Sequence, residues 1–265
     1  MEWWLAYLLL GAVVGYFAGL LGIGGGLILV PVLTFIFNVQ HFPPDRILHL
    51  ALGTTMATIV FTSISSLRTH HAHGAVNWKV VKYITPGIIV GTLAGATLVN
   101  ALSSKVLGII FVTFIFYAAT QMLLGISPKP SRILPGRIGM FGAGSLIGMI
   151  SSFVAIGGGL LTVPFLSVCN VRLQHAIGTA AAIGFPIAVA GTIGYIVNGM
   201  AQSQPLPEYS LGYVYPPALG WIVLASMLTA PLGAKATHVM RTATLRKIFV
   251  VLLYLLGIKM LMELF

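Results

Sequence analysis

Two glycine triplets stand inside otherwise apolar runs of this sequence. Residues 23–33 read IGGGLILVPVL and residues 156–166 read IGGGLLTVPFL, which are identical at eight of eleven positions. Consecutive glycines break a helix and leave backbone amides uncovered, and the helix that follows begins with a partial positive charge. The six glycines predicted to bind an anion are Gly24, Gly25, Gly26, Gly157, Gly158 and Gly159.

Hydroxyl groups near the triplets are candidates for direct contact with the anion. Thr54 and Thr55 follow the first triplet, and Ser152 and Thr179 flank the second. We predict that these four side chains complete the binding site. The alternative is that each hydroxyl bonds to its own helix or to a neighbouring one, as serine and threonine often do in membranes.

Histidines are the candidates for proton chemistry. His49 and His175 occupy matching places in the sequence, and the four acidic residues (Glu2, Asp45, Glu208 and Glu263) lie near a terminus or between apolar runs. We therefore predict His49 and His175 as sites of proton coupling, with helix capping near the membrane surface as the alternative. The tract RTHHAHG at 68–74 lacks cysteine and acidic partners, so we predict no metal site and no cofactor.

The composition predicts a membrane protein. Of 265 residues, 58% are hydrophobic and only 7% are charged, whereas soluble domains carry about 25% charged residues. Polar–apolar alternation is absent, so helices rather than barrel strands are expected to span the bilayer. The net charge of +10 comes from basic residues scattered between the apolar runs, which indicates contact with lipid headgroups and excludes a nucleic-acid-binding surface.

The repeat predicts two membrane units, residues 1–125 and 135–265, joined by a cytoplasmic linker at 126–134. Each unit is expected to be a glycine-broken helical hairpin followed by three transmembrane helices, with 8–10 helices in total. This count leaves both termini and three basic residues (Arg46, Lys105, Lys259) outside the cytoplasm. It places eleven on the cytoplasmic side: Arg68, Lys79, Lys82, Lys129, Arg132, Arg137, Arg172, Lys235, Arg241, Arg246 and Lys247.

An odd number of membrane crossings in each unit means that the second unit has the opposite orientation in the membrane to the first, so the two units are inverted repeats. The two triplets would then enter from opposite faces. The second hairpin arm, residues 26–37, is about 18 Å long at 1.5 Å per residue, so the two turns should meet near the middle of the bilayer. Glycines spaced four apart, as in the two series Gly11, Gly15 and Gly19 and Gly87, Gly91 and Gly95, predict close helix packing instead.

The repeated glycine turn followed by Val-Pro, with Gly53-Thr54 and Gly178-Thr179 opening the next helix, resembles the sulfite exporter TauE/SafE family of bacterial membrane permeases. The resemblance covers nearly the whole chain. It implies a multi-pass protein of the bacterial inner membrane that exports sulfite, organosulfonates or similar anions, and it implies no enzymatic activity.

Two other functions remain open at this point. A passive anion channel could use the same architecture, and counterflow would distinguish it from a carrier. A membrane enzyme or metal-handling protein would need a cluster of reactive side chains at membrane depth, which the sequence does not contain.

Overall fold

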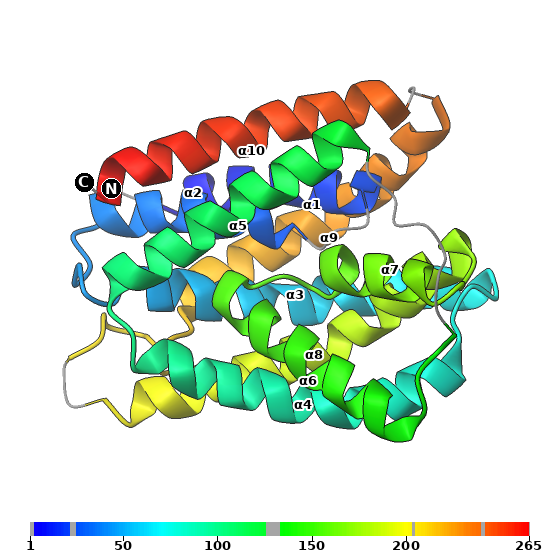
Figure 1. Ribbon diagram of the computed structural model, residues 1–265. Helices are drawn as coiled ribbons and strands as arrows, with labels where there is room; N and C mark the ends of the chain where they lie inside the picture. Colours follow the sequence, from blue (N-terminus) through cyan, green and yellow to red (C-terminus); the bar gives the residue numbers. More distant parts are fainter. Residues whose placement is uncertain (1–2, 22–24, 126–132, 203–204, 240–241, 265) are drawn as a thin grey trace.

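The computed structural model describes residues 3–21, 25–125, 133–202, 205–239 and 242–264. In this part of the chain there are ten helices (Figure 1), which confirms the all-helical membrane fold. They are α1 (Trp4–Leu21), α2 (Gly26–Val39), α3 (Ile47–Ala72), α4 (Trp78–Asn100), α5 (Ser104–Leu124), α6 (Arg137–Val154), α7 (Gly159–Val168), α8 (Leu173–Met200), α9 (Pro216–Val239) and α10 (Thr242–Leu264).

Six of the described helices are long and apolar enough to cross a membrane: α3, α4, α5, α6, α8 and the Pro216–Gly233 part of α9. The helices that follow the glycine triplets are short. α2 has 14 residues and α7 has 10, which corresponds to about 21 Å and about 15 Å. Neither reaches across a hydrocarbon core of about 30 Å. The second arm of the first hairpin ends at Val39, two residues beyond the expected Phe37.

Glycine stripes bring the helix pairs α4–α6 and α1–α9 into backbone contact. A side-chain carbon at Gly87 or Gly91 would overlap the carbonyl oxygen of Phe141 or Ser145 in α6. In the same way, Gly11 and Gly15 of α1 lie directly against the backbone of α9. The predicted packing role of these glycines is therefore confirmed. The order of these contacts shows that the two helices of each pair run in the same direction, since a later glycine contacts a later residue of the partner helix.

Helices of the same rank in the two sequence repeats run antiparallel where they meet. In α3 and α8, Gly53 lies beside Tyr195 whereas Met56, further along α3, lies beside the earlier residue Gly191. α5 and α10 show the same relation, because Gly108 faces Leu264 and Thr120 bonds to Tyr254. Helices α1 to α5 of the first repeat correspond in order to α6 to α10 of the second. If each helix is replaced by its counterpart, the pair α4–α6 becomes the pair α9–α1, and the pairs α3–α8 and α5–α10 stay the same.

The connecting segments gather at the two ends of the helices. One end holds the start of α1, the end of α10 and the segments that follow α2, α4 and α8 (Figure 1). Hydrogen bonds tie this end together: Arg46 donates to Gln202, and Ser104 donates to the carbonyl of Asp45. The segments that follow α3 and α7 gather with the residues just before α6 at the opposite end, where residues 74–79 lie beside residues 134–140 and 170–175.

Candidate functional site

A glycine with a positive φ stands immediately before each of the two short helices, and in the second copy the preceding helix α6 ends at Val154, where Ala155 is left-handed (φ 46°). Gly25 (φ 72°) precedes α2, and Gly158 (φ 70°) precedes α7. These backbone angles are accessible to glycine at little cost and are unfavourable for residues with a side chain. The predicted breaks are thus confirmed at Gly25 and Gly158, whereas Gly24 lies outside the described residues.

The two turns touch one another. A side-chain carbon at Gly26 would overlap the carbonyl oxygen of Ala155, which belongs to the second turn, and Ile59 packs against both Gly26 and Gly157. Ile59 is the thirteenth of the 26 residues of α3, so the turns meet halfway along that helix. This contact brings the first turns of α2 and α7, with their partial positive charge, to the centre of the molecule.

Part of the hydrogen-bonding capacity at the turns is used locally. In α2, the N–H groups of Ile28 and Leu29 donate to the carbonyl of Gly25, and in α7 the N–H of Thr162 donates to that of Gly158. In contrast, the described residues offer no backbone acceptor to the N–H groups of Leu160 and Leu161. Donors of this kind remain available to an anion.

Three buried hydroxyl groups lie about one helical turn from residues that take part in the contact between the glycine turns. Ser151 at the end of α6, Thr162 in α7 and Thr55 in α3 are completely buried, and their oxygens have no hydrogen-bond partner among the described residues. Thr55 was among the predicted site residues, whereas Thr162 was not. The sequence did carry a signal for it, because Thr162 stands where the first copy of the repeated stretch has Leu29.

Thr54 and Thr179 have matching structural roles. The hydroxyl of Thr54 accepts a hydrogen bond from the N–H of Tyr215 (3.0 Å), just before α9. The hydroxyl of Thr179 accepts one from the N–H of Asn77 (2.9 Å), just before α4. Each threonine therefore holds the entrance to the fourth helix of the other repeat, and we call these two bonds the crossed tethers.

The glycine that precedes each threonine makes room for its tether. A side-chain carbon at Gly53 would overlap the carbonyl oxygen of Tyr213, and one at Gly178 would lie 2.5 Å from that of Ala75. Both Gly-Thr pairs lie in the second turn of their helix rather than at its start. Each Gly-Thr pair therefore allows an extended segment of the chain to pack against the helix. The glycine leaves room for the segment, and the threonine oxygen accepts a hydrogen bond from it.

Replacing Thr54 or Thr179 by valine is expected to destabilise the protein by about 1–3 kcal/mol, because a buried backbone N–H loses its acceptor. The thermal midpoint of the purified protein in detergent measures the effect. Thr→Ser at the same positions keeps the oxygen and should restore most of the stability. Thr97→Val, which changes an exposed hydroxyl bonded to its own helix, should leave the midpoint unchanged. Equal midpoints for T54V, T179V and T97V would contradict the tether assignment.

Ser152 packs in the α4–α6 interface. Its hydroxyl lies 2.8 Å from the carbonyl oxygen of Thr92 and 3.1 Å from that of Gly148, and it donates to them. The side chain also lies against Gly95. This hydroxyl therefore bonds to its own and a neighbouring helix, which was the alternative weighed for it, and its contact with an anion stays a prediction.

The two matching histidines have different surroundings. Each is the third residue of its helix, α3 or α8. His49 is completely buried, its Nε2 lies 3.2 Å from the carbonyl oxygen of Val99, and its ring lies 5.1 Å from the ring of Tyr213. His175 is exposed and lines a cavity. Their equivalence in sequence is thus not an equivalence in environment.

The histidine tract at 68–74 is engaged in local contacts. The Nδ1 atom of His73 lies 2.8 Å from the carbonyl oxygen of Thr69, and the indole of Trp78 donates to Nδ1 of His71. Within the described ranges, no three His, Cys, Asp or Glu side chains are grouped so that they could hold a metal ion.

Helical breaks in contact at the centre of a bundle of apolar membrane helices define a multi-pass membrane protein of the transporter class. Comparison with known families agrees with this class. The model of the sulfite exporter TauE/SafE family matches residues 7–260, so the chain belongs to this family. It is therefore a membrane transporter of the TauE/SafE type, with a small-molecule substrate.

Relatives of similar length carry transporter names. A probable membrane transporter protein of Haemophilus influenzae is 38% identical over 261 residues, which cover 97% of each chain. One of Methanocaldococcus jannaschii is 27% identical, over 96% of this chain and 94% of its own. The probable membrane transporter protein YdhB of Bacillus subtilis is 25% identical over 91% and 92% of the two chains. No solved structure matches the chain.

Proposed function

We propose that this protein is a secondary transporter that exports a small sulfur-containing anion, such as sulfite or an organosulfonate, by alternating access. The observation that carries the proposal is the contact between the two glycine turns. It brings the N-termini of two short helices to one place, together with the buried hydroxyls of Thr55, Ser151 and Thr162. Such an arrangement provides hydrogen-bond donors without a negative charge, which suits an anion.

We propose further that residues 1–125 and 135–265 are two inverted repeats and that residues 126–134 link them in the cytoplasm. The antiparallel course of α3 against α8 and of α5 against α10 supports the inversion. The distribution of charge supports the sidedness. Lys79, Arg137 and Arg172 lie at one end, whereas Arg46, Lys105 and the ends of the chain lie at the other, and basic residues favour the cytoplasmic side.

A carrier fits the packing of the turns better than an open pore. Residues 25, 26 and 155–158 are buried, and Gly26 is in direct contact with Ala155. Binding at the turns therefore requires them to move. In a two-fold arrangement of inverted repeats, such a movement would open the turns to one side at a time.

The test is the flux of labelled sulfite and sulfoacetate into proteoliposomes. We expect saturable uptake that is accelerated by unlabelled anion inside the vesicles, since a carrier exchanges substrate across the membrane. A flux without saturation or counterflow would identify a channel. If neither anion is transported, the assigned substrate class is wrong.

A pH gradient across the same vesicles tests proton coupling. We assign this role to His175, which is exposed and lines a cavity at one end of the helices. Sulfoacetate uptake by the wild type should respond to the gradient, whereas uptake by H175Q should not. A gradient response of the same size in both proteins would remove His175 from the coupling step.

A further inference from the structure

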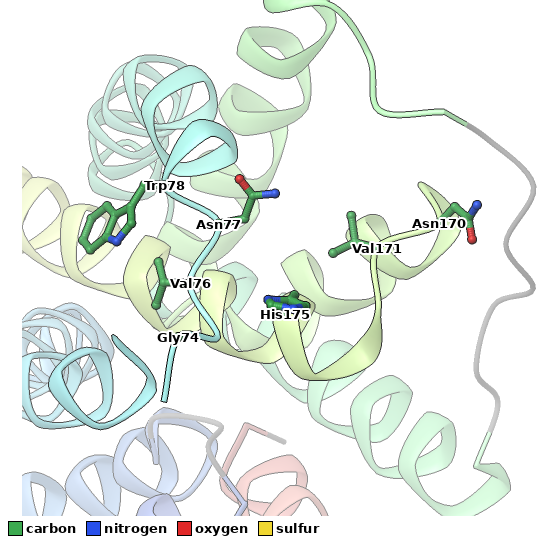
Figure 2. A pocket seen from close by; sticks show the side chains of 7 residues that line it. All are labelled: Gly74, Val76, Asn77, Trp78, Asn170, Val171 and His175. Atoms are coloured by element: carbon green, nitrogen blue, oxygen red, sulfur yellow. The ribbon is translucent and has the colours of Figure 1, made fainter. Parts of the chain in front are cut away.

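A cavity of about 500 Å³ opens at the end of the molecule that carries the basic segments. It lies between the segment before α4 and the start of α8, and Asn77, Val171 and His175 are among its lining residues (Figure 2). The Oδ1 atom of Asn77 accepts a hydrogen bond from the N–H of Val80, and the amide nitrogen points to the side on which Val171 lies. The cavity thus presents uncharged donors and a histidine.

α8 contacts both this cavity and the second glycine turn. His175 lines the cavity, and Thr179 lies one turn further along the helix and bonds to Asn77. Beyond Thr179, the backbone of Ala180 and Gly184 packs against Gly158. At 3.6 residues per turn, Gly184 lies on the opposite side of α8 from His175, and the stretch of helix between the two residues is about 13 Å long.

The equivalent place at the opposite end is filled by aromatic rings. The two ends can be compared residue by residue. Gly74 and Gly212 both have a positive φ, of 65° and 55°. Three residues after each of them, Asn77 and Tyr215 donate the hydrogen bonds of the two crossed tethers. Val171 and Phe42 also correspond, because the N–H of each donates to a carbonyl in the last turn of the preceding helix. The Phe42 ring lies 4.9 Å from Phe37 and 5.2 Å from Tyr215.

Matching residues at the two ends therefore differ in burial. His49 is fully buried and His175 is exposed. Val214 is 3% exposed, whereas its counterpart Val76 is only half-buried and lines the cavity. The backbone contacts at the two ends are equivalent, so the difference lies in the side chains that fill the space.

We propose that the cavity beside Asn77 and His175 is the open access path for the anion at the basic end, and that the cluster of Phe37, Phe42 and Tyr215 is the same path closed at the other end. This inference rests on the proposed transport function. It assigns the cavity to a small anion such as a sulfonate, which hydrogen-bonds to the Asn77 amide before it reaches the turns. The aromatic cluster prevents simultaneous opening at both ends.

The test compares V76C with V214C, a pair with the same residue type at matching positions. The single cysteine, Cys169, is replaced by serine in both variants, and A101C, at an exposed position beside the closed end, serves as the control for accessibility there. In detergent, a water-soluble maleimide is expected to react with V76C about tenfold faster than with V214C, because exposure controls thiol reactivity. Equal rates, or a faster V214C, would overturn the proposal.

Two further measurements connect accessibility to transport. Adding Phe42→Ala to V214C should raise its reaction rate towards that of V76C, and no change would show that the aromatic ring does not seal this end. After labelling and reconstitution, V76C should lose sulfoacetate flux and A101C should keep it. Full flux through labelled V76C would exclude the cavity as the access path.

These outcomes separate the inference from the proposed function. If the C169S parent transports neither sulfoacetate nor sulfite, the proposed substrate class fails, and the maleimide rates still decide between an open and a closed end. If the parent transports and the two thiols react equally, the transport function stands and the assignment of the access path is wrong.

Discussion

Gly26→Ala is expected to reduce the initial rate of anion flux by about tenfold or more, because the added methyl group forces the two glycine turns apart. Gly26 is the first residue of α2 and has a helical conformation, so alanine causes no backbone strain there. The new carbon would overlap the carbonyl oxygen of Ala155, which belongs to the backbone and cannot rotate away. The loss of flux would therefore report on the contact between the turns.

The matched control for this variant is Gly220→Ala. Gly220 lies in α9, and nothing stands within 4 Å of the position that a side-chain carbon would take. G220A should transport at the wild-type rate, and both variants should elute as the wild type does in size-exclusion chromatography. A wild-type rate for G26A would mean that the contact between the turns is not needed for transport.

Gly91→Ala is expected to have the largest effect on stability. A side-chain carbon at Gly91 would overlap the carbonyl oxygen of Ser145, so α4 and α6 would have to separate along their length. Overpacking of this kind costs about 1–3 kcal/mol or more, and the rigid helix backbones leave little room for relaxation. The thermal midpoint of the purified protein measures the loss.

Gly142→Ala provides the comparison within the same helix pair. Gly142 is in α6 at an exposed position with nothing within 4 Å of the added carbon. Alanine favours a helix over glycine by about 1 kcal/mol, so G142A should keep or raise the midpoint while G91A lowers it. If both variants shift the midpoint in the same direction by the same amount, helix propensity rather than packing explains the result.

The features that depend on local backbone chemistry were predictable from the sequence. Gly25 and Gly158 stand at the predicted interruptions, and both have a positive φ, which glycine adopts at little cost. The stripe of Gly87, Gly91 and Gly95 likewise predicted close packing, since small residues four apart leave one helix face flat. In both cases a few neighbouring residues determine the structure.

The features that depend on contacts between distant segments were not predictable. Thr54 and Thr179 were predicted to bind an anion, and the sequence did not indicate that each accepts a hydrogen bond from a segment more than one hundred residues away. His49 and His175 had the same sequence signal, yet only the structure distinguishes the buried ring from the exposed one. A single sequence does not encode which end of a transporter is open in one conformation.

The crossed tethers have a consequence for the origin of the chain. Each threonine holds a helix entrance of the opposite repeat, and α1 and α6 each bury their glycine stripe against the fourth helix of that repeat. A polypeptide of half this length would leave those surfaces and amides exposed to lipid. A second copy could cover them. Under the proposed inversion of the repeats, that copy would be inserted in the opposite orientation, so an ancestor of half the length would be an antiparallel homodimer.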